Sequence, residues 1–168
     1  MSKQHPDQRV GVFVDIGNMY HSAKNIYNAK INFGRLLTDL VNDRQLVRAM
    51  AYIIISQSSE EANFFDALTK QGYELKSKDL QIFPGGQKKG DWDVGLAVDA
   101  ITIAKHLDVV VLVTGDGDFI PLVNYLKHTE GCKVEIAAFE KSCSAKLVEV
   151  VDDFINLSKN YKKYLIKR

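Results

Sequence analysis

Two carboxylates follow one of the most apolar stretches of the chain. The segment VVVLVTGDGDF spans residues 109–119 and places Asp116 and Asp118 on either side of Gly117. A single aspartate here would be an ordinary turn or helix-cap residue. Two ionised carboxylates this close repel each other, however, and a positive partner such as a metal ion relieves the repulsion. The spacing therefore predicts a metal site directly after an apolar strand.

Three further acids occupy comparable positions. Asp15 ends the apolar run RVGVFVD and is followed by Asn18, while Asp91 and Asp93 stand at the start of the apolar segment WDVGLAVDAITIAKHL. Each acid alone has a structural alternative, because Asp15 and Asp91 could cap helices and Asp116 could close a turn. Taken together, they form an oxygen-rich set of the kind that Mg²⁺ or Mn²⁺ prefers.

Alternating strand and helix patterns must position these acids. Apolar and β-branched runs predict strands at 9–15, 45–56, 73–83, 109–114 and 133–139. Helical spacing predicts helices at 17–29, 32–43, 59–72, 92–107 and 119–131, followed by C-terminal helices, with Asn32 and Ser59 as caps. This alternation predicts an α/β fold in which helices cover both faces of a five-stranded parallel sheet. Ligands bind beyond the carboxyl ends of such strands, where the acids would converge if strands 9–15 and 109–114 are neighbours.

Composition limits the class of protein. The 168 residues are 46% hydrophobic and 26% charged, which fits one domain over residues 1–168 with a core at about 9–158. No apolar run approaches the roughly 18 residues of a membrane span. The polar start MSKQHPDQR also lacks the apolar region of a secretory signal, so we expect a cytoplasmic protein with no membrane partner. The sequence leaves monomer and homodimer open.

Positive charge is gathered in two places although the net charge is only +1. Lys88 and Lys89 belong to the loop GGQKKG, and the tail at 159–168 contains five basic residues and no acid. Solvated surfaces are the more frequent explanation for such runs, so the two patches alone show little. The two loop lysines nevertheless stand beside the acids, where they would contact the phosphates of a passing nucleic acid.

Three motifs together resemble a known family. VFVDIGNMY, KKGDWDVGLAVDA and LVTGDGDF, in this order and spacing, are similar to the NYN domain, in the LabA-like branch of the PIN-like nuclease superfamily. The resemblance covers roughly residues 9–158 and implies a three-layer α/β/α sandwich with strand order 3-2-1-4-5. By position it implies that the catalytic residues of a metal-dependent ribonuclease fall on Asp15, Asn18, Asp93, Asp116 and Asp118, the four aspartates being metal ligands.

One departure from the family pattern leaves an alternative open. The family commonly has a single residue between its Lys-Gly and the acid that starts the helix, whereas Asp91 and Trp92 both intervene here. Asp91 and Asp93 therefore both remain candidates for the metal-facing acid. Asp99 follows Asp93 by about 600° of helical rotation, which points it to another face and favours an outer or structural role, although it too is kept as a candidate for the metal site.

The expected activity is hydrolysis of RNA phosphodiester bonds at a carboxylate-bound Mg²⁺ or Mn²⁺. Lys88, Lys89 and Thr114 are the residues expected to contact RNA. The alternative is a regulatory RNA- or protein-binding module that keeps the acidic pocket but turns over slowly or not at all, since a fold alone does not establish activity.

Overall fold

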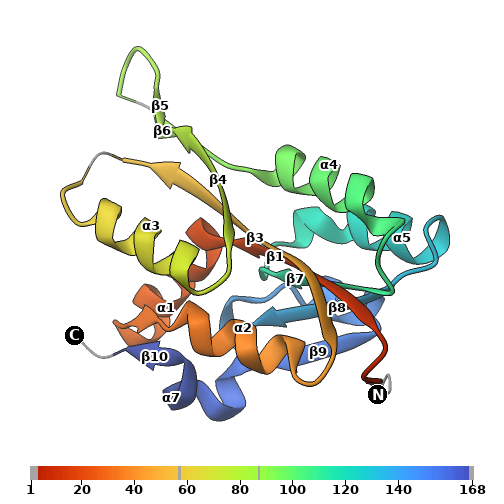
Figure 1. Cartoon of the computed structure of the whole chain (residues 1–168). Helices are drawn as coiled ribbons and strands as arrows, with labels where there is room; N and C mark the ends of the chain where they lie inside the picture. The colour runs from red at the N-terminus through yellow and green to blue at the C-terminus, as the bar shows by residue number, and fades with distance from the viewer. Residues whose placement is uncertain (1–3, 57, 87, 167–168) are drawn as a thin grey trace.

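A six-stranded parallel sheet forms the centre of the molecule (Figure 1). The structure is a computed structural model, and it describes residues 4–56, 58–86 and 88–166, without the side chains of Lys88 and Lys89. The strands, in spatial order, are β4 (Glu74–Asp79), β3 (Gln45–Ile55), β1 (Arg9–Asp15), β7 (Val109–Val113), β8 (Lys133–Ala138) and β9 (Asp153–Asn156). Because β1 pairs with both β3 and β7, the strand order reverses at β1.

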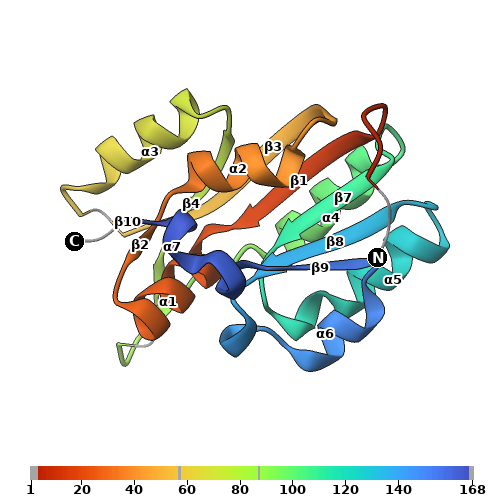
Figure 2. The ribbon, with the colours of Figure 1, turned by 90° about the horizontal axis from the view of Figure 1, so that it is seen from below.

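Helices cover both faces of this sheet. One face carries α1 (Ile16–Tyr27), α2 (Phe33–Val41), α3 (Glu61–Lys70) and the short α7 (Tyr161–Tyr164). The other carries α4 (Asp93–Ala104), α5 (Ile120–His128) and α6 (Ala145–Val150). Figure 2 shows α1, α2 and α7 in front of the strands and α4 behind them. None of the helices in the described ranges has the length and apolarity that a bilayer span requires.

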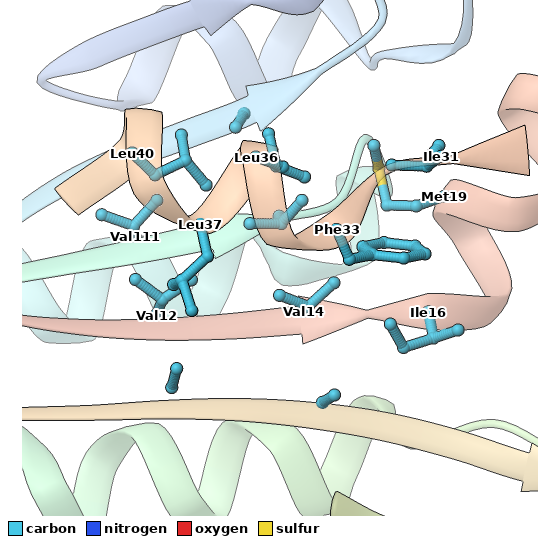
Figure 3. Close-up of a cluster of buried hydrophobic side chains, with 14 of the residues drawn as sticks. Val12, Val14, Ile16, Met19, Ile31, Phe33, Leu36, Leu37, Leu40 and Val111 are labelled. Carbon is cyan, nitrogen blue, oxygen red and sulfur yellow. The ribbon is translucent and has the colours of Figure 1, made fainter. Parts of the chain in front are cut away.

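Alternate residues of the central strands fill two separate cores. Val12 and Val14 of β1 face α1 and α2, and Leu37 and Phe33 of α2 reach toward them (Figure 3). Phe13, between those valines, faces α4 and α5 instead. A strand buried on both faces needs apolar residues at every position, which is why the run at 9–15 is continuous rather than alternating.

The predicted α/β class and the strand order are confirmed, but the prediction of five strands is wrong. The sixth strand, β9, adds to the edge of β8 where C-terminal helices were expected. Asp152 starts this pairing, because its backbone and its carboxylate both bond to the backbone of Val134. A four-residue strand lacks the length from which a sequence pattern can be recognised.

The predicted strand at 73–83 is divided in two. Pairing of β4 with β3 ends at Asp79, after which Leu80 N–H bonds to Ile55 O at 3.1 Å. The next residues form β5 (Gln81–Ile82), which pairs antiparallel with β6 (Lys88–Lys89) as a separate hairpin. Of the glycine-rich loop predicted at 85–90, Gly86 belongs to the turn and Lys88–Lys89 form the return strand of that hairpin.

Smaller elements complete the fold. Asn32 caps α2 as predicted, with its side chain accepting from Arg35 N–H at 3.0 Å. The predicted Ser59 cap is wrong, since α3 begins after Glu60 with no capping side-chain bond. Within the basic tail, β10 (Leu165–Ile166) pairs antiparallel with β2 (Lys30–Ile31). Three short 3₁₀ helices lie at Gly117–Phe119, Glu140–Ser142 and Leu157–Asn160.

Candidate functional site

The first part of the site lies where β1 passes into α1. Asp15 ends the strand and caps the helix, because its Oδ1 accepts a hydrogen bond from Asn18 N–H at 3.2 Å. The Asn18 side chain turns toward the next strand and accepts from Gly115 N–H at 3.1 Å. Asn18 therefore joins the end of β1 to the loop that follows β7.

The loop after β7 holds the paired acids. Thr114 is fully buried, and its hydroxyl accepts from Asp116 N–H at 3.2 Å. Asp116 in turn accepts from Asp118 N–H at 2.9 Å, which caps the 3₁₀ turn. The backbone lies so close to the neighbouring loop that a Cβ on Gly115 would stand 2.5 Å from Ser142 O. Glycine at this position is required by space, and it fixes where the two carboxylates project.

The third part of the site is the start of α4. Asp91 Oδ1 accepts from Asp93 N–H at 3.1 Å. Between them, Trp92 is half-buried and donates its indole N–H to Ile53 O at 2.9 Å. These bonds fix the first turn of α4 against β3 and direct Asp93 toward the loop after β7.

Three carboxylates converge at this point. Asp93, Asp116 and Asp118 each offer an oxygen, and the three oxygens lie within 4.8 Å of one another. They come from the start of α4 and from the loop after β7, which meet at the carboxyl edge of the sheet, beside the reversal of strand order at β1. Oxygen donors at this spacing suit a hard divalent cation.

Asp15 and Asp91 lie outside that group but influence it electrostatically. Burial, followed by the charges of Asp116, Asp91, Asp15 and Asp118, raises the pKa of Asp93 from 3.8 to about 6. Burial is also the largest cause that raises the pKa of Asp15, with further contributions from Asp116 and Asp91, while hydrogen bonds from Asn18 N–H and Thr114 oppose the rise. The five acids therefore share one electrostatic environment.

The negative charge of this environment is not neutralised locally. Among the side chains that the structure describes, no Lys, Arg or His forms an ion pair with any of the five acids, which are Asp15, Asp91, Asp93, Asp116 and Asp118. Asp15 caps α1 and Asp116 caps the 3₁₀ turn, as the structural alternative anticipated. Asp91 does not cap α4, whose N-cap residue is Trp92, and only accepts from Asp93 N–H. Capping uses one carboxylate oxygen and leaves the other available, so the two roles are compatible.

The remaining predicted residues lie elsewhere. Asp99 accepts from Tyr52 Oη–H at 2.8 Å and lies 3.9 Å from Lys76 Nζ, outside the group of three. Thr114 is fully buried, which corrects its prediction as an RNA contact, because its hydroxyl is directed to Asp15 and Asp116. The backbone of Lys88 and Lys89 forms β6, and their side chains lie outside the described part of the chain.

Sequence reasoning missed the loop that supports the paired acids. Ser144 donates its backbone N–H to Gly115 O at 2.9 Å, and a Cβ on Gly117 would meet its Oγ at 2.9 Å. The only signal in the sequence is the polar stretch KSCS at 141–144, which follows the strand at 133–139 and so falls at the same edge of the sheet.

Two known proteins are similar to this chain in sequence. The chain is 23% identical over 161 residues to the low amplitude and bright protein LabA of Synechococcus elongatus, covering 89% of this chain and 84% of LabA. It is 25% identical over 166 residues to an uncharacterized protein of Methanocaldococcus jannaschii, covering 95% of this chain and 60% of that protein.

A solved structure shares the whole fold. The crystal structure of a protein of unknown function from Vibrio parahaemolyticus superimposes with a TM-score of 0.88 at 28% sequence identity, over 98% of this chain and 100% of that one. The family model of the NYN domain matches residues 9–158. The chain therefore belongs to the NYN domain family, within the PIN-like nuclease superfamily.

Proposed function

We propose that this protein is a ribonuclease that hydrolyses RNA phosphodiester bonds with Mg²⁺ or Mn²⁺ bound at the acidic site. The observation that supports this most is the approach of the Asp93, Asp116 and Asp118 oxygens to within 4.8 Å of one another. Membership of a nuclease superfamily makes nucleic acid the expected class of substrate.

Four of the five acids, and Asn18, have a role in this proposal. Asp93, Asp116 and Asp118 hold the ion, and Asp15 adds negative charge from behind them. Asn18 positions the loop after β7 through its bond to Gly115 N–H. A bound divalent ion would supply charge stabilisation at the phosphate and lower the pKa of an attacking water. No nucleophilic side chain is needed for this chemistry.

RNA contact is assigned to Lys88 and Lys89, which precede Asp91 by three and two residues. Cationic side chains near the acids offset the repulsion between the site and a phosphate backbone. Replacing both with alanine should weaken RNA binding and reduce its dependence on salt by up to about two phosphate contacts. Unchanged affinity and salt dependence would assign RNA binding to another surface.

The activity is tested with a generic single-stranded RNA and purified protein. We expect cleavage with Mn²⁺ or Mg²⁺, none in EDTA, and loss of cleavage in Asp116→Asn. That variant keeps the acceptor oxygen that caps the turn at Asp118, so its fold should be preserved. If the wild type binds RNA but shows no metal-dependent cleavage at any RNA concentration, the protein is a binding module and the proposal is wrong.

A further inference from the structure

The β5–β6 hairpin presents apolar side chains to solvent. It stands away from the sheet between β4 and α4 (Figure 1). Ile82 is 68% exposed and Phe83 is 43% exposed, although both residues are large and apolar. Among the described aromatic side chains, none stacks against Phe83. Exposed apolar side chains on a projecting element are typical of a surface that contacts a ligand or partner.

The base of the hairpin is held against the end of β3. Leu80 N–H bonds to Ile55 O at 3.1 Å as the hairpin begins. As it ends, Gly90 lies so close to Ile54 that a Cβ would stand 2.9 Å from that side chain. A hydrogen bond from Gly86 N–H to Phe83 O at 3.1 Å also stabilises the turn at the tip. The hairpin thus holds Phe83 in a defined position relative to β3.

The hairpin is also close to the acids along the chain. Ile82 pairs with Lys88, and Lys88 precedes Asp93 by five residues. Five residues span at most about 18 Å when fully extended. A polymer bound at the acidic site therefore has the hairpin within reach.

The charge along this path favours a polyanion. Residues 76–90 contain four lysines and one aspartate. Lys78 Nζ lies 4.6 Å from the centre of the Trp92 ring, directly beside the start of α4. Lys76 is paired with Asp99, so Lys78 is the described lysine of this stretch that would meet a phosphate. An exposed aromatic ring followed by lysines in the sequence suits a single strand of nucleic acid, in which bases stack on the ring while lysines contact phosphates.

We propose that the β5–β6 hairpin binds the RNA strand outside the cleavage site, with Phe83 stacking on a base, Ile82 packing beside it and Lys78 contacting the backbone. This rests on the proposed function for the identity of the substrate. Binding by the hairpin does not require turnover, however, so it can be measured with no metal present.

The test uses the full chain in EDTA at low salt and an RNA of about 12 nucleotides, within the site size of single-strand binding surfaces. The RNA carries 2-aminopurine, whose fluorescence is quenched when the base stacks. We expect the wild type to quench it, and Phe83→Leu to lose the quenching and bind roughly 5-fold or more weakly. Phe83→Trp should restore both. Tyr125→Leu, which removes an exposed aromatic ring from α5, is the matched control and should bind as the wild type does.

Two results would overturn the proposal. One is unchanged affinity and quenching in Phe83→Leu. The other is a wild-type dimer that Phe83→Leu converts to monomer in sedimentation while RNA binding stays the same, which would make the hairpin an interface between copies of the chain. Both outcomes are separate from the ribonuclease proposal, which fails only if metal-dependent cleavage is absent.

Discussion

Replacing Asp93 with asparagine should stabilise the metal-free protein. Burial and the neighbouring acids raise the pKa of Asp93 from 3.8 to about 6, so the ionised carboxylate is disfavoured in the folded state. Without solvent screening, this shift in pKa would correspond to about 3 kcal/mol in the free energy of unfolding. Because Asp93 is only partly buried, solvent screening reduces the expected gain in the free energy of unfolding to about 1 kcal/mol at pH 7.

The pH dependence of this gain provides its internal check. A carboxyl whose pKa is raised on folding binds more protons in the native state between the two pKa values, so stability falls as pH rises through this range. The penalty from Asp93 is therefore absent below about pH 3.8 and fully present above about pH 6. Asp93→Asn should exceed the wild type in stability at pH 7 and approach it at pH 4.

Urea denaturation in EDTA at both pH values measures the difference. Adding Mn²⁺ should stabilise the wild type, by about 2.7 kcal/mol at 100 times the dissociation constant, and should stabilise Asp93→Asn less. If Asp93→Asn is less stable than the wild type at pH 7, Asp93 serves the fold and the electrostatic reasoning is refuted.

Three further substitutions distinguish residues that stabilise the fold from residues that support cleavage. Glu135→Ala should cost about 3–5 kcal/mol in urea denaturation, because it leaves the buried Arg44 guanidinium without the carboxylate that it binds at 2.8 Å; a cost under 1 kcal/mol would contradict this. Gly115→Ala should have a larger effect on the rate of RNA cleavage than on the free energy of unfolding, since its Cβ would push against Ser142 O and displace the paired acids. Cleavage at the wild-type rate would show that the loop adapts. Asp99→Asn should retain metal-dependent cleavage, because Asp99 bonds to a tyrosine hydroxyl outside the group of three, and abolished cleavage would return it to the metal site.

The central strands could be predicted because burial on both faces leaves a strong pattern. The runs at 9–15 and 109–113 are almost continuously apolar, and both form central strands. Strand β9 could not be predicted, since it depends on the free edge of β8 and on Asp152 rather than on a pattern of its own. The hairpin could not be predicted for a similar reason. The alternation of residue types continues from β4 into β5, although the chain leaves the sheet between them.

The sequence indicated which residues belong to the site better than it indicated how those residues are arranged. Placement at the carboxyl ends of strands indicated Asp116 and Asp118, and the start of a helix indicated Asp91 and Asp93. Only the structure shows that Asp93, and not Asp91, offers an oxygen to the group of three. Asp91 and Asp93 are two residues apart, and the first turn of the helix decides which of them faces the site. Here the bond from Trp92 to β3 fixes that turn.

The most direct test of the central claim is a titration of Mn²⁺ in which bound ion, measured by electron paramagnetic resonance, and the rate of RNA cleavage are followed in the same samples. For the wild type, occupancy and rate should rise together with one dissociation constant, and Asp116→Asn should lose both while remaining folded. Cleavage that persists in EDTA, or Mn²⁺ binding that is unchanged in Asp116→Asn, would contradict a metal-dependent ribonuclease built on these carboxylates.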